Sequence, residues 1–145
     1  MRPLAGVDAG GKTRVEEHVL SGIDDCLRQA MTIPGAIGAS VVDYTTGSAL
    51  AWAGNAPTGD PDASAAGSSD VIHAATSRAP FASTRPNDLV EDVVITTHGG
   101  YHLLRMIRTD FDSRLLLYVW LDRHEGNLAV AQRRIRILAD DLVAA

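Results

Sequence analysis

The segment from Ile33 to Gly54 constrains the fold more than any other part of the chain. Pro34 and Gly35 end the helical pattern before them, because proline lacks the N–H that a helix interior needs and glycine accepts left-handed backbone angles. Small and apolar residues then alternate from Ile37 to Val42 with the two-residue period of a strand. Tyr44 to Gly47 predicts a tight turn, because its final glycine tolerates positive φ. We therefore expect a helix end followed by a β-hairpin, with no reactive side chains in it.

Two amphipathic helices are predicted, one near each end of the chain. The first is expected from about 13 to 31 and opens with the Thr-x-x-Glu spacing of a capping box. The second is expected from about 125 to 142, with Asp122 and Glu125 capping its start. In both segments apolar residues recur at helical spacing and charged residues lie mostly off that stripe.

The middle of the sequence carries weaker signals. Residues 55–69 are rich in Gly, Pro, Ala, Ser and Asp without a core pattern, so they predict a loop. A short helix is expected from about Asp70 to Arg78, because Gly67 and two nearby serines are poor helix formers and Pro80 stops the helix. Three strands rich in β-branched and other apolar residues should follow, at 93–97, 103–107 and 115–121.

The last three strands are expected to belong to one sheet. A tight turn should join the first two, with His98 opposite Tyr101 and Thr97 opposite His102. The strand at 115–121 is apolar on both faces, so we expect a cover on each side of the sheet. The predicted order is helix, two strands, helix, three strands, helix.

Composition restricts the class of protein. A chain of 145 residues with 46% hydrophobic content suits a single globular domain. We expect a flexible lead-in at 1–12 and one domain at 13–145. The net charge of −5 argues against general nucleic-acid binding. One cysteine, no membrane-length apolar run and no apolar stretch of a signal peptide predict a cytoplasmic protein without membrane insertion.

The residues from Gly6 to Thr13 match the GxxxxGK[ST] phosphate-binding loop and precede a helix. A working loop of this type follows a buried strand, whereas only five residues precede this one and they include Arg2 and Pro3. Thr13 already serves as the expected helix cap. We therefore predict that the match is accidental, while an NTPase that uses this loop stays an alternative.

Other reactive residues have simpler explanations. His98 and His102 suggest a metal pair, but the expected hairpin register would point them to opposite faces. Cys26 falls on the apolar stripe of the first helix, where it acts as a small hydrophobe. No serine has the sequence frame of a nucleophile elbow. We predict no catalytic, cofactor-binding or metal-binding residues, no cofactor and no enzymatic activity.

The order of these elements resembles the roadblock/dynein light chain family over roughly Arg14 to Ala145. Each motif alone is weakly specific, and the argument rests on their order and spacing. The segment at 55–89 departs most, because the family usually has a well-formed second helix there. The motifs that carry the resemblance are Ile33–Ala39, Val42–Gly47 with Trp52–Gly54, and Leu117–Asp122 with Gly126–Ala131.

The resemblance implies an α+β fold with a five-stranded antiparallel sheet, two helices on one face and one on the other. It also implies a homodimer formed through the middle helix and the adjacent edge strand. Members of the family are non-catalytic regulators and scaffolds, and bacterial members are associated with small Ras-like GTPases. A small-molecule sensor of PAS or profilin-like shape, which also uses a five-stranded sheet, is the alternative within binding proteins.

The expected interface combines one strand and one helix. The strand at 93–97 is apolar on both faces and opens its group, so an unpaired edge there would promote aggregation unless a partner covers it. The middle helix has little apolar material to bury and keeps polar groups available for a partner. The predicted interface residues are Val71, His73, Ala74, Arg78, Val93, Val94 and Ile95.

Overall fold

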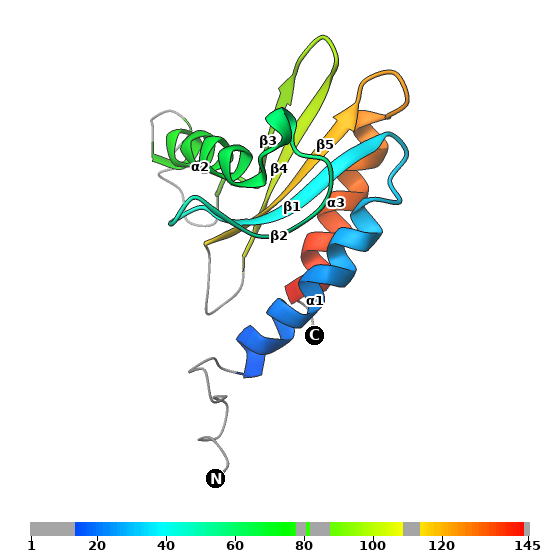
Figure 1. Cartoon of the computed structure of the whole chain (residues 1–145). Coiled ribbons are helices and arrows are strands. Elements are labelled where there is room, and N and C mark those ends of the chain that lie inside the picture. The colour runs from blue at the N-terminus through cyan, green and yellow to red at the C-terminus, as the bar shows by residue number, and fades with distance from the viewer. Residues whose placement is uncertain (1–13, 78–80, 82–87, 109–113, 144–145) are drawn as a thin grey trace.

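The computed structural model describes residues 14–77, 81, 88–108 and 114–143 (Figure 1). The expected lead-in at 1–12 and the phosphate-loop match lie outside these residues, as do Thr13 and Arg78. The elements, in chain order, are α1 (Arg14–Ala30), β1 (Ala36–Asp43), β2 (Ser48–Gly54), the short 3-10 helix η1 (Pro57–Gly59), α2 (Pro61–Ser77), β3 (Asp92–Thr96), β4 (Gly100–Ile107), β5 (Leu115–Asp122) and α3 (Leu128–Val143).

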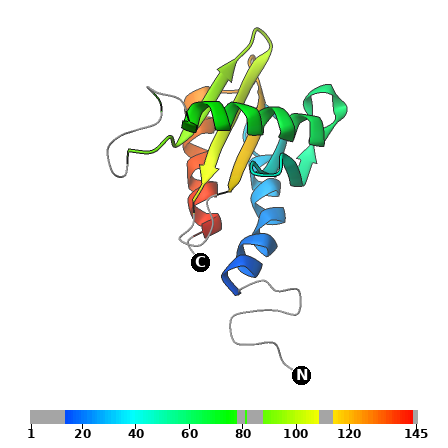
Figure 2. The same cartoon turned by 90° about the vertical axis from the view of Figure 1, so that its left-hand side faces the viewer.

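The strands form one antiparallel five-stranded sheet in the order β2-β1-β5-β4-β3. Helices α1 and α3 lie side by side on one face, and α2 crosses the other (Figures 1 and 2). This arrangement confirms the predicted α+β fold and the predicted order of elements. Strands β2 and β3 form the two edges of the sheet.

Strand β5 lies at the centre and is buried on both faces, as its sequence predicts. Leu117, Val119 and Leu121 pack with α1 and α3 in the larger core. Leu116 and Tyr118 pack with Ile72 of α2 in a smaller core on the opposite face. Each large apolar side chain buried in this way contributes about 1.5–3 kcal/mol to folding. Cys26 also lies in the larger core, where burial raises the pKa of its thiol to about 11.

The loop predicted at 55–69 is wrong over most of its length, because α2 begins at Pro61 and runs for 17 residues. Proline suits the first turn, where no helical hydrogen bond is lost. The Asp60 carboxylate accepts a hydrogen bond from the Asp62 N–H at 3.0 Å and helps to fix the start. Ala65 and Ile72 are buried against the sheet. This packing outweighs the low helix propensity of the glycine and serines on which the prediction rested.

The register predicted for the β3–β4 hairpin is also wrong, by two residues on one strand. Thr96 pairs with Tyr101, and Ile95 pairs with His102. Thr97 closes the turn, since its N–H donates to the Gly100 carbonyl at 2.8 Å and its hydroxyl accepts from the Gly100 N–H at 3.1 Å. His102 therefore lies on the α2 face of the sheet, directly opposite Ile95.

The start of α3 lies at Leu128, three residues later than predicted. The Asn127 side chain caps it by accepting a hydrogen bond from the Val130 N–H at 3.1 Å. Asp122 instead accepts from the backbone N–H groups of His124 and Glu125, which stabilises the preceding turn. Asp122 and Glu125 are therefore not the cap of this helix.

We expect Asn127→Ala to destabilise the fold by about 1 kcal/mol, because the first turn of α3 loses its side-chain cap. Urea unfolding followed by circular dichroism measures this loss. Gln132→Ala, a substitution inside the same helix, is the control and should change the midpoint little. An unchanged midpoint for Asn127→Ala would contradict this assignment of the cap.

Candidate protein-interaction site

An open groove lies on the α2 face of the sheet, between α2 and the β3 edge. Its volume is about 340 Å³. Most contacts of α2 with the sheet are with β1 and β2, so the β3 side of this face is less covered. The groove is lined from α2 by Ala63, Ser64, Gly67, Ser68 and Val71, and from the sheet by Ile95, His102, Leu104 and Tyr118.

Small side chains on the α2 wall leave this groove open to a partner. A Cβ built on Gly67 would meet no atom within 4 Å. Across the groove, the Ile95 side chain on β3 is 38% exposed, which is high for a large apolar residue on a sheet. Leu104 lies at the base and is buried. The groove therefore combines an apolar floor, an exposed apolar rim and a wall that permits close approach.

Polar and aromatic groups meet at the centre of the groove. His102 Nδ1 lies 2.7 Å from the Tyr118 hydroxyl, and the same hydroxyl is hydrogen-bonded to Ser64 of α2. The His102 ring stacks on Tyr118 and on Trp120, with centroid distances of 5.9 and 6.2 Å. Burial lowers the pKa of His102 and raises the pKa of Tyr118. Burial therefore favours the uncharged form of both groups.

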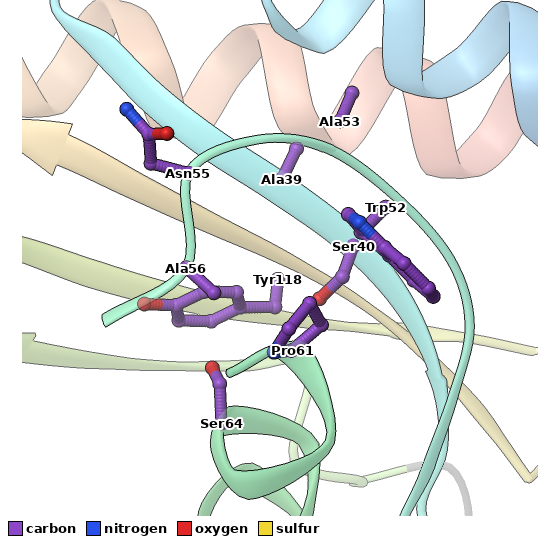
Figure 3. A pocket seen from close by; sticks show the side chains of 9 residues that line it. All are labelled: Ala39, Ser40, Trp52, Ala53, Asn55, Ala56, Pro61, Ser64 and Tyr118. Carbon is purple, nitrogen blue, oxygen red and sulfur yellow. The ribbon is translucent and has the colours of Figure 1, made fainter. Parts of the chain in front are cut away.

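A second, much smaller cavity lies beyond Tyr118, towards β1 and β2 (Figure 3). Its volume is about 10 Å³, close to the space that one water molecule needs. Figure 3 shows Tyr118 between Ala56 and Ser64, with Trp52 beside Ser40. Trp52 is 56% exposed, so it adds a large apolar group to the surface next to α2.

The structure places two of the predicted interface residues, Val71 and Ile95, in the lining of the groove. Val93 packs against the smaller core on the same face of the sheet. Val94 points to the other face of the sheet and packs against the larger core. Ala74 is exposed on α2.

His73 lies on the other flank of α2, away from the groove. Its Nε2 is 2.8 Å from the Tyr44 carbonyl in the β1–β2 turn, and its ring meets the Tyr44 ring edge to face. Ser69 also donates to that carbonyl. His73 thus helps to hold α2 on the hairpin, a role that its place in the sequence does not show. The seventh predicted residue, Arg78, lies outside the described residues.

Strand β3 is the edge of the sheet beside the groove. It carries one charged residue, Asp92, and no proline. Arg105 of β4 lies 3.4 Å from Asp92 and 3.6 Å from Glu91, so ion pairs surround only its first residue. Proteins commonly protect free edges with lysine, proline or a covering element. The rest of β3 lacks such protection within the described residues.

The groups that suggest catalysis or metal binding do not come together. Within residues 14–77, 88–108 and 114–143, the structure holds no group of three His, Cys, Asp or Glu residues that could bind a metal ion. His98 lies in the β3–β4 turn, whereas His102 lies in the groove. None of the helices in the described part of the chain is long and apolar enough to cross a membrane.

Three helices and a five-stranded antiparallel sheet in this order form a roadblock/LC7-type fold. MglB from Myxococcus xanthus is similar, with a TM-score of 0.66 and 17% identity, over 88% of this chain and 86% of that one. A Roadblock/LC7 domain from Streptomyces avermitilis gives a TM-score of 0.64 and 18% identity, over 82% of this chain and 92% of that one.

An MglB structure described as having a tetrameric arrangement is also similar, with a TM-score of 0.63 and 18% identity, over 99% of this chain and 95% of that one. No protein-family model matches the chain, and no curated protein does. At these identities the likeness establishes the fold, and the role of the protein has to be argued from its surface.

Proposed function

We propose that the protein is a non-catalytic homodimeric scaffold or regulator of a small Ras-like GTPase in bacterial cytoplasmic signalling. The observation that carries this proposal is the unprotected β3 edge beside an open groove, on a roadblock/LC7-type fold. The family that the sequence resembles is associated with such GTPases. The tetrameric arrangement described for one MglB structure further supports self-association.

A two-fold axis normal to the sheet would pair β3 with β3 of a second copy. Opposite residues of an antiparallel pair share a face, so one residue must lie opposite its own copy. Centring the pair on Val94 keeps the whole strand paired, because Val93 then meets the second copy's Ile95 and Asp92 meets its Thr96. This register also keeps the two Asp92 carboxylates apart. The edge would gain backbone hydrogen bonds and apolar contacts without a charge clash.

The same axis would place both α2 helices on one side of the joined sheet. Each groove would then lie next to the dimer seam, where the second copy can cover Ile95 and Val71. The outer side of α2 would stay accessible, since Ala66, Asp70 and Ser77 lie on one helix face away from the groove and are exposed. We assign this outer side to the GTPase, and the groove and β3 to the dimer.

The proposed function is tested by titrating the protein with a small Ras-like GTPase of the same organism, loaded with GDP or with a non-hydrolysable GTP analogue. Calorimetry should show binding that prefers one nucleotide state. Ala66→Arg on the outer side of α2 should weaken that binding about tenfold or more, because it places a large charge at the contact.

Ala129→Arg on α3 introduces the same side chain at another exposed helical position and is the matched control. It should leave GTPase affinity unchanged. If neither nucleotide state binds, the GTPase assignment is wrong. If Ala129→Arg weakens binding while Ala66→Arg does not, the partner lies on the α1 and α3 face.

A further inference from the structure

His102 is the one imidazole among the described residues that line the groove, and burial lowers its pKa from the ordinary value of an imidazole. It lies directly opposite Ile95 on β3 and opposite Trp120 on β5, so it stands beside the edge assigned to the dimer. Its Nδ1 is committed to the Tyr118 hydroxyl at 2.7 Å. Its ring remains partly accessible from the groove.

We propose that His102 makes homodimer formation pH-dependent: the second copy covers the groove when the imidazole is neutral and is released when the imidazole is protonated. This inference rests on the homodimer of the proposed function. It adds a regulatory group to that interface.

The hydrogen bonds of His102 favour its neutral form. We assign the neutral ring to the tautomer with its hydrogen on Nε2, in which Nδ1 accepts the hydroxyl hydrogen of Tyr118 and the Tyr118 oxygen is available to Ser64. A protonated ring donates from Nδ1, so Tyr118 becomes the acceptor and must turn its own hydrogen away. Ser64 then has to accept instead of donate. Protonation therefore reverses a chain of hydrogen bonds that reaches the first turns of α2.

Among the described residues that line the groove, none carries a charge that compensates a protonated His102. The residues that line it from α2 are small or apolar, with two serines. Strand β3 presents Ile95, and β5 presents Tyr118 and Trp120. Tyr118 is the only other titratable group among the lining residues, and burial raises its pKa, so it stays uncharged. Asp92 and Arg105 lie on the opposite face of the sheet, since they alternate with Val93 and Leu104.

The direction of the pH effect follows from burial. A cover over the groove removes water from an imidazole that has no counterion, which lowers the pKa of His102 below its value in the monomer. When association lowers the pKa of a group, the dimer has its full stability at pH values above the pKa of that group in the monomer. This stability is lost as pH falls through that value. The association constant can fall at most tenfold per pH unit for each proton that the protein takes up on dissociation.

The test is sedimentation of the full chain between pH 8 and pH 5.5. The dissociation constant of the wild-type dimer should rise about tenfold or more between pH 7.5 and pH 5.5. His102→Asn keeps an acceptor near the position of Nδ1 but does not titrate, so its dimer should lose this dependence. His98→Asn, in the exposed β3–β4 turn, is the matched control and should retain the wild-type dependence.

A second measurement needs no change at His102. NMR titration of its ring should give a lower pKa in the wild-type dimer than in the wild-type monomer obtained at low protein concentration. Equal pKa values, or the same pH dependence in His102→Asn and wild type, would overturn the inference while leaving the dimer intact. A chain that is monomeric at every pH would instead overturn the dimer itself.

Discussion

Gly38→Ala is expected to destabilise the protein by about 3 kcal/mol or more, because the added Cβ has no room. A Cβ at this position would lie 1.7 Å from the Asn55 carbonyl oxygen and 2.8 Å from its carbon. Both atoms belong to the backbone, so no flexible side chain can move aside. Gly38 also pairs with Gly54 of β2 and with Trp120 of β5, which fixes β1 on both sides.

Urea unfolding of Gly38→Ala and wild type at pH 7.5 measures this difference. Gly67→Ala is the matched control, since its Cβ meets nothing within 4 Å and it lies inside α2. This control should gain about 0.5–1 kcal/mol, because alanine favours a helix more than glycine does. If Gly38→Ala unfolds at the same urea concentration as wild type, the backbone at Asn55 can move away from the added Cβ at little cost. The expected steric clash would then be wrong.

Local chemistry made most of the fold predictable. Pro34 and Gly35 end a helix wherever they occur in this order, and Gly47 takes the positive φ that its turn needs. The stripes of α1 and α3 contain large apolar residues at helical spacing, which is the strongest signal a sequence carries. The two-sided apolar pattern of β5 gave the layers of the fold, because a strand of that kind needs cover on both faces.

The middle helix was too short in the prediction for a physical reason. Helix α2 buries Ala65, Ser68 and Ser69 together with Ile72, so it packs on the sheet through small side chains. Such a helix has no large apolar stripe, and propensity alone favours a loop. The β3–β4 register failed because one hydroxyl, that of Thr97, closes the turn.

The candidate site was predictable only in part. Unbroken apolar residues in β3 identified Val93 and Ile95, since an edge of this type needs a partner. The groove itself joins Gly67, His102 and Tyr118, which are far apart in the sequence. Sheet order, the pairing of β4 with β5 and the position of α2 bring them together, and none of these follows from local patterns.

Gly67→Arg is expected to abolish self-association without unfolding the chain. The position lies on the groove wall and has open space around its missing Cβ, so the folded monomer can accept a long side chain. A second copy that covers the groove would meet this side chain and would have to bury its charge. No Asp or Glu lines the groove to pair with it. Uncompensated burial of this kind should raise the dissociation constant about 100-fold or more.

Sedimentation velocity at pH 7.5, over a range of protein concentrations, tests the effect. Thermal unfolding should confirm that Gly67→Arg folds, and Ala129→Arg on α3 should dimerise like wild type. The two variants distinguish a dimer formed through the groove from one formed through the α1 and α3 face. In the second case Ala129→Arg would weaken the dimer and Gly67→Arg would not. A Gly67→Arg protein that sediments as the wild-type dimer would show that the groove stays open on assembly. Both the assigned interface and the role of His102 would then have to be abandoned.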